Sequence, residues 1–156
     1  LNAGMTRDEA LLSFSESLEN HQRSAPVFQK GVWVRDESAA EVARMYDSAF
    51  DRLPDMNGLV GWTEAHKAGL SLTAMAQGFI ASTEFQARYG ALDNAAFVDK
   101  VYRNVLDRPA DPDGHKAWIS ALDHGASRAE VLVGFSESAE HKMMRAPYID
   151  DGIWFV

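Results

Sequence analysis

An internal repeat restricts the fold of this chain more than any other feature of its sequence. Shifting the 156-residue sequence by 56 positions places Tyr46 on Tyr102, and the matched segment needs no gap. Chance does not produce such self-similarity, so the chain is expected to contain tandem copies of one unit. The identical pairs include Val42/Val98, Asp51/Asp107, Arg52/Arg108, Asp55/Asp111, Gly58/Gly114, Trp62/Trp118, Gly69/Gly125, Ser71/Ser127, Gly78/Gly134, Phe79/Phe135, Ser82/Ser138 and Glu84/Glu140.

A second shift, by 121 positions, places the start of the chain on its end. Residues 14–17 then fall on residues 135–138, with the same sequence FSES, and Trp33 falls on Trp154. Because the chain opens inside a unit, we expect it to be part of a longer protein. The two shifts divide it into residues 1–38, the back half of a unit with an apolar tail; residues 39–94, a complete unit; and residues 95–156, a complete unit with its own tail.

Each complete unit has the apolar spacing of α-helices. Val98, Val101, Tyr102 and Val105 follow the i, i+3, i+4, i+7 pattern of a buried helical face. Helix boundaries are marked by an N-cap before a proline, a capping box and a terminal glycine, at Asp111-Pro112, Ser127–Glu130 and Gly125. The predicted fold is therefore all-α, with tandem helical repeat units packed in one compact body.

The tails after the first and last units have a different composition. Residues 27–34 and 148–156 are rich in β-branched and aromatic residues, and a glycine precedes the apolar run in each. This pattern predicts short extended, β-like segments. They either pair with each other or pack on the helices or on a neighbouring unit.

Charge and composition exclude several classes of protein. The net charge of −8 repels phosphate backbones and anionic lipid headgroups, so we expect no nucleic-acid partner. No apolar run approaches the roughly 18–20 residues of a membrane span, so we expect no membrane insertion. The absence of cysteine removes disulfides, thiolate zinc sites and cysteine nucleophiles. No glycine-rich phosphate loop is present, and the GFSES sequence at residues 134–138 lacks the second glycine of a serine nucleophile elbow.

The segment from Tyr102 to Glu140 resembles a known bacterial family. Its pattern is Tyr102, then LDRPADPDG at residues 106–114, then Trp118 and GFSESAE at residues 134–140. This pattern resembles the repeats called domain of unknown function 4214, with two copies in residues 39–146 and a partial copy in residues 1–22. The resemblance implies a small helical module of secreted or cell-surface proteins, with no established activity. The family has glycine where this chain has Asp107, which implies a changed turn or changed hydrogen bonding there.

The acidic turns are the best candidates for a metal site. Asp107, Asp111 and Asp113 precede Gly114 in the last unit, and carboxylate oxygens are calcium ligands. An EF-hand loop counted from Asp111 would have leucine at its twelfth position, where calcium loops need a glutamate. We therefore expect Asp111 to act as a helix cap and expect no cofactor, with calcium as the weaker alternative. The corresponding residues of the middle unit are Asp51, Asp55 and Asn57.

The remaining titratable residues indicate no catalytic centre. The five histidines do not form an HExxH pair, so most are expected at the surface. The carboxylates are expected on solvated helical faces, beside lysine and arginine. No acid/base pair can be selected from them.

Binding is the remaining class of function. Trp62 and Trp118 are expected in the core, whereas Trp33, Trp154 and Tyr148 lie in the tails. Exposed aromatic rings beside polar side chains such as those of Asp55, Asn57, Asp111 and Asp113 would suit sugar stacking, although packing of the tails explains the same aromatic residues.

We therefore expect a non-enzymatic structural or binding module of a secreted or cell-surface bacterial protein. Its role would be adhesion, assembly or protein–protein contact, and its partners a protein, a polysaccharide or neighbouring domains of a longer parent chain. The alternatives are a carbohydrate-binding module and an accessory domain of a glycan-processing enzyme. The extracellular location follows from the family resemblance alone.

Overall fold

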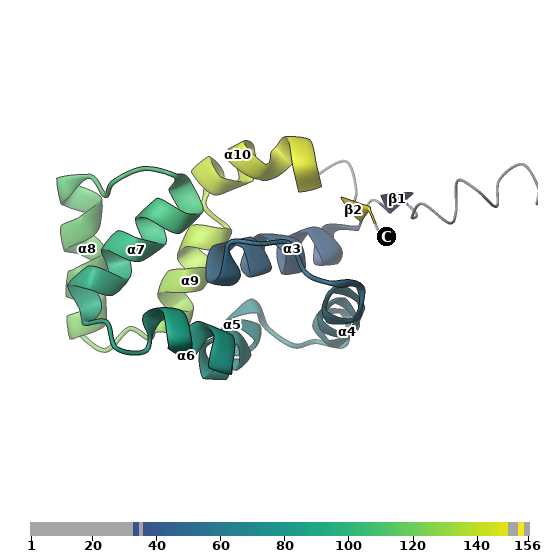
Figure 1. Ribbon diagram of the computed structural model, residues 1–156, viewed down its shortest axis with the longest axis horizontal. Helices are drawn as coiled ribbons and strands as arrows, with labels where there is room; N and C mark the ends of the chain where they lie inside the picture. The colour runs from purple at the N-terminus through teal and green to yellow at the C-terminus, as the bar shows by residue number, and fades with distance from the viewer. Residues whose placement is uncertain (1–32, 35, 150–152, 155–156) are drawn as a thin grey trace, which may run out of the picture. The chain divides into compact units, whose positions relative to one another are not determined.

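The structure, a computed structural model, describes residues 33–34, 36–149 and 153–154 (Figure 1). Two compact units are distinguished, and the larger one, Arg35–Ile153, contains every described helix. The first four helices are α3 (Glu37–Phe50), α4 (Met56–Lys67), α5 (Leu72–Ala81) and α6 (Thr83–Tyr89). The next four are α7 (Asn94–Leu106), α8 (Pro112–Asp123), α9 (Arg128–Ser136) and α10 (Ala139–Ile149). The predicted all-α fold class is confirmed.

Short polar side chains start the helices. Each accepts a hydrogen bond from a backbone N–H of the first turn, which otherwise has no partner within the helix. Ser127 and Glu130 form the predicted capping box, in which each side chain accepts from the other's backbone N–H. The N-cap residues are Asp36, Asp55, Ser71, Ser82, Asp93, Asp111 and Ser127.

The core of the larger unit surrounds α3. In Figure 1, α3 crosses the middle of this body, with α10 on one side and α5 on the other, and it packs on α4 and α9. Eleven of its fourteen residues are buried. By contrast, only six of the thirteen residues of α7 are buried, although α7 lies 56 residues later at the matching sequence position. The two helices share an apolar face, but only α3 is covered on its other side.

The same aromatic cluster occurs twice in the structure, at positions 56 residues apart in the sequence. The ring of Phe79 lies 4.7 Å from Tyr46 and 5.1 Å from Trp62. Fifty-six residues later, the ring of Phe135 lies 4.8 Å from Tyr102 and 5.3 Å from Trp118. Both tryptophans pack on these phenylalanines yet stay partly exposed. They were expected in the core, and they line its edge instead.

Glycine permits this packing. A Cβ placed on Gly78 would come within 2.9 Å of the Trp62 ring, and one on Gly134 within 2.5 Å of the Trp118 ring. Both glycines lie inside helices, where alanine has the higher helix propensity. Close approach of the tryptophan ring therefore explains why glycine is found at these positions.

Two short strands complete the described part of the chain. β1 (Trp33–Val34) and β2 (Ile153–Trp154) form a two-stranded sheet. Most of the two apolar tails lies outside the described residues, so their extended conformation stays a prediction. None of the described helices is long and apolar enough to span a lipid bilayer.

Candidate functional site

The acidic turns act as helix caps. The Asp111 carboxylate accepts the backbone N–H of Gly114 at 2.8 Å, and Asp55 accepts that of Gly58 at 2.9 Å. The hydrogen bond from the Gly114 backbone, together with the nearby Arg108 guanidinium, lowers the pKa of Asp111. The carboxylate is thus held ionised at the positive end of a helix, where an anion is favoured.

The aspartates that replace the family's glycine occupy a special backbone position. Asp51 ends α3 with φ 52°, and Asp107 ends α7 with φ 50°. This left-handed conformation is easiest for glycine, and aspartate tolerates it better than most other residues do. The turn therefore takes a conformation that a glycine would also allow.

An arginine follows each of these aspartates and connects the turn to a later helix, α6 for Arg52 and α10 for Arg108. Arg52 forms two hydrogen bonds to Glu84, at 3.1 and 2.9 Å, and Arg108 forms two to Glu140, at 2.6 and 2.8 Å. These contacts lower the pKa of Glu84 and of Glu140. Arg108 also lies 3.4 Å from a carboxylate oxygen of Asp111, so it contacts both α10 and the N-cap of α8.

The predicted calcium ligands do not converge. Asp113 and Asn57 are exposed in the first turns of α8 and α4, and Asp107 lies within 4.0 Å of the Arg145 guanidinium. Within residues 36–149, no group of three or more carboxylate or imidazole side chains is arranged to hold a metal ion. Because Asp111 is occupied by a backbone N–H and an arginine, a calcium ion would have to compete with both.

We expect calcium to leave the thermal stability unchanged. Replacing Asp111 with alanine should lower the melting temperature equally in millimolar calcium and in EDTA, since the variant loses a cap in both. Differential scanning calorimetry checks this. A calcium-dependent rise of the wild-type melting temperature that Asp111→Ala abolishes would instead establish a calcium site, because a ligand stabilises the state it binds.

The predicted aromatic site is only partly described. Tyr148, near the end of α10, is 68% exposed. The side chains of Trp33 and Trp154 lie outside the described residues. The structure therefore places one of the three aromatic candidates, Tyr148.

A buried charged cluster, absent from the sequence-based candidates, joins α3 to α10. His141 is fully buried, its Nε2 lies 2.9 Å from an Asp47 carboxylate oxygen, and its Nδ1 lies 2.9 Å from the carbonyl oxygen of Ser136. Arg145 donates to the same Asp47 oxygen at 2.7 Å. Both ring nitrogens of His141 therefore face oxygen atoms.

A second buried ion pair continues this cluster towards α9. Arg44 on α3 is 1% exposed and donates two hydrogen bonds to Glu137, both at 3.0 Å. Lys142 Nζ lies 2.7 Å from one of the same Glu137 oxygens, and Glu37 accepts from Arg44 at 2.9 Å. The expectation of solvated carboxylates is therefore wrong for Asp47 and Glu137, because packing of α9 and α10 on α3 covers these side chains. The same packing makes His141 an exception to the expectation that most histidines lie at the surface.

His66 makes a similar contact between α4 and α3. Its Nδ1 lies 2.6 Å from the carbonyl oxygen of Leu70, and its Nε2 lies 2.8 Å from the Glu41 carboxylate. The backbone contact with Leu70 and the Glu41 carboxylate raise the pKa of His66, because both contacts favour the protonated ring.

The raised pKa of His66 predicts lower stability at alkaline pH. The charged His66 ring stabilises the folded protein fully below about pH 6.5, the pKa of histidine in the unfolded chain. This stabilisation is lost as the pH rises through the higher pKa of His66 in the folded protein. Urea unfolding should be measured from about pH 5.5 to about pH 9, which spans the titration range of histidine. The free energy of unfolding should fall more steeply with rising pH for the wild type than for His66→Gln. Parallel curves for the two proteins would contradict this assignment.

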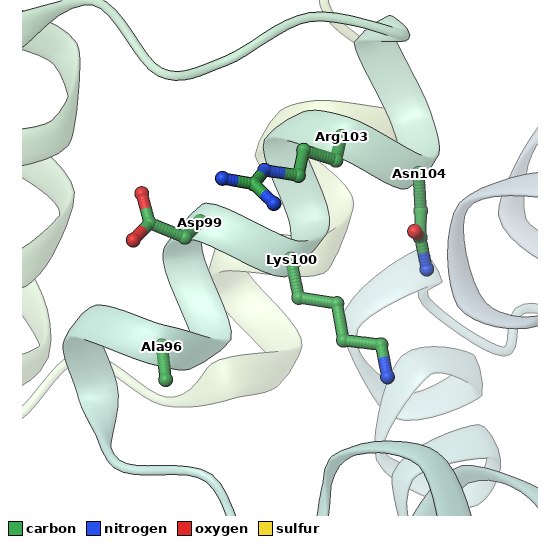
Figure 2. A pocket seen from close by; sticks show the side chains of 5 residues that line it. All are labelled: Ala96, Asp99, Lys100, Arg103 and Asn104. Atoms are coloured by element: carbon green, nitrogen blue, oxygen red, sulfur yellow. The ribbon is translucent and has the colours of Figure 1, made fainter.

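A hollow of about 390 Å³ lies on the outer side of α7. Figure 2 shows its lining side chains, with Asp99 and Arg103 projecting to one side and Lys100 and Asn104 to the other. Lys100 donates to the Arg88 carbonyl at 3.0 Å, and Asn104 donates to the Tyr89 hydroxyl at 2.7 Å. The hollow is thus polar and partly bordered by α6.

The comparisons with known proteins agree with the resemblance seen in the sequence. Residues 76–144 match the family described as Domain of unknown function (DUF4214), over a segment that starts in α5 and ends in α10. No curated protein and no solved structure matches the chain significantly. The similarity to the DUF4214 family therefore lies in residues 76–144.

Proposed function

We propose that this chain is a non-enzymatic structural or binding module of a secreted or cell-surface bacterial protein, acting in assembly or protein–protein contact. The observation that supports this role best is the buried charged cluster between α3 and the α9–α10 pair. Buried charges tolerate little displacement, since an unpaired charge in a core is costly. The cluster therefore fixes two helical units as one rigid body.

The proposal includes tandem-repeat organisation, with units at residues 39–94 and 95–156 and a partial unit at residues 1–38. Contacts that recur 56 residues apart support it. The arginine–glutamate pair Arg52–Glu84 recurs as Arg108–Glu140, and the N-cap Asp55 recurs as Asp111. Helical repeats bury their apolar faces against neighbours, so a rigid array presents a constant surface to a partner.

Deleting this chain from its parent protein tests the proposed role. We expect the deletion to leave any enzymatic activity of the parent intact and to impair its attachment or assembly at the cell surface. Protease added to intact cells should cleave the parent protein if the location is extracellular. An activity that is lost on deletion and restored by the purified chain would show that the chain is itself catalytic.

The exposed Tyr148 ring favours carbohydrate binding as a second candidate. Aromatic rings with one open face stack on sugars. Polysaccharides that quench the intrinsic fluorescence of the wild type, and that bind Tyr148→Ala at least about tenfold more weakly, would support this function. If the wild type and Tyr148→Ala both bind a protein partner and neither binds a polysaccharide, assembly is favoured instead.

A further inference from the structure

The hollow on α7 has a buried counterpart on α3. Its lining residues are Ala96, Asp99, Lys100, Arg103 and Asn104. Fifty-six residues earlier stand Ala40, Ala43, Arg44, Asp47 and Ser48, which are 4%, 0%, 1%, 8% and 0% exposed. Every position that lines the open hollow thus corresponds to a position that is covered on α3.

Two helices of the following unit provide this cover. α9 and α10 pack on α3, where Glu137 meets Arg44, and His141 with Arg145 meets Asp47. The order of this packing follows the sequence, because the first helix of one unit packs against the third and fourth helices of the unit that comes after it. If the array continues in this direction, the open face of α7 receives the equivalent helices of a unit placed after it.

Residues 6–24 of this chain have the sequence of such a helix pair. They align with residues 127–145, and Glu16 takes the position of Glu137. On α7, Lys100 takes the position of Arg44. A cation on α7 and a carboxylate in residues 6–24 therefore stand at the positions where Arg44 and Glu137 form an ion pair.

The second contact, between Asp47 on α3 and His141 with Arg145 on α10, has different residues at both sets of matching positions. The acidic Asp47 of α3 is replaced by the basic Arg103 on α7. The side chains that meet Asp47 are those of His141 and Arg145, and they are matched in residues 6–24 by the uncharged Asn20 and Ser24. No positive charge in these matched positions would oppose Arg103. Arg103 is exposed, and within residues 36–149 it has no carboxylate partner.

We propose that the outer face of α7 binds residues 6–24 of a second copy of this chain, in head-to-tail order. This inference rests on the proposed assembly role and names the partner of that role. The contact is heterologous, so it forms rings if the rotation closes and filaments if it does not. Because the face is polar, we expect weak association that decreases with salt.

The test is the mass of the full-length chain in solution, measured by sedimentation velocity at low and high salt over about 1 µM to 1 mM. We expect the wild type to associate beyond one chain at low salt. Lys100→Glu and Glu16→Lys should each weaken association at least about tenfold, because each places like charges opposite one another. An equal mixture of the two variants should associate again, with the two chains in alternating order, because every contact between unlike chains then joins opposite charges.

Two controls separate this contact from misfolding and from net charge. Circular dichroism melting shows whether each variant folds. Lys116→Glu makes the same charge change at an exposed residue of α8 that does not line the hollow. A wild type that remains a single chain at every concentration overturns the inference, as does association that neither charge reversal affects. Either result leaves the assembly role open to other partners, since the deletion experiment tests that role separately.

Discussion

Replacing Asp47 with alanine is expected to destabilise the protein by about 3–5 kcal/mol, the usual cost of removing one partner of a buried ion pair. The variant leaves Arg145 without its closest carboxylate and leaves the buried His141 ring with an unmatched nitrogen. Both groups were desolvated by packing of α10 on α3. Urea unfolding followed by circular dichroism measures the loss.

The repeat supplies a matched control for Asp47. Arg103 occupies the same position of α7 but is exposed, so Arg103→Ala is expected to change the stability by less than about 0.5 kcal/mol. Asp47→Asn keeps the shape of the side chain and removes its charge, and it should fall between the two. A loss below about 1 kcal/mol for Asp47→Ala would mean that other groups satisfy His141 and Arg145 once the carboxylate is gone.

Replacing Gly134 with alanine is the second substitution with a large expected effect. The new methyl group would lie 2.5 Å from the Trp118 ring, which packs on Phe135 and cannot move without disturbing that contact. Overpacking of this kind costs about 1–3 kcal/mol, and it outweighs the gain of up to about 1 kcal/mol from the higher helix propensity of alanine. We therefore expect net destabilisation, measured by urea or thermal unfolding.

Two other helical glycines, Gly61 and Gly78, serve as controls for this prediction. Gly61 also lies inside a helix, but nothing lies within 4 Å of an added Cβ, so Gly61→Ala should raise the stability by up to about 1 kcal/mol. Gly78→Ala should cost less than Gly134→Ala, because its Cβ would lie 2.9 Å from the Trp62 ring. In a Trp118→Leu background the cost of Gly134→Ala should fall, since the clashing ring is absent. Equal effects of all three glycine substitutions would contradict the steric explanation.

Much of the local structure follows from the sequence, because it depends on neighbouring residues. The N-cap role of Asp111 and the capping box of Ser127 and Glu130 involve contacts three residues apart, and both occur as predicted. The apolar spacing of Val98, Val101 and Val105 likewise predicts the buried face of α7. Helix type, helix boundaries and family resemblance were therefore available before any tertiary structure.

The candidate site was less accessible from the sequence. The acidic turns suggested metal or sugar binding, and the structure uses Asp55 and Asp111 as helix caps. The charged cluster around Asp47 was missed because its partners lie far away in the chain: His141 is 94 residues distant. The 56-residue spacing gave no indication of it, since Asp47 aligns with Arg103 and His141 aligns with Phe85.

By itself, the sequence determined the helical units, their boundaries and their apolar faces, since these depend on periodicity and on contacts within one turn. Only the tertiary structure decided which polar residues are buried. α3 and α7 occupy the same position in two similar segments, yet α9 and α10 cover the polar side of α3 alone. The physical reason is that burial of a side chain depends on which neighbouring helix covers it, and that neighbour is set by the packing of units rather than by the residues within one helix.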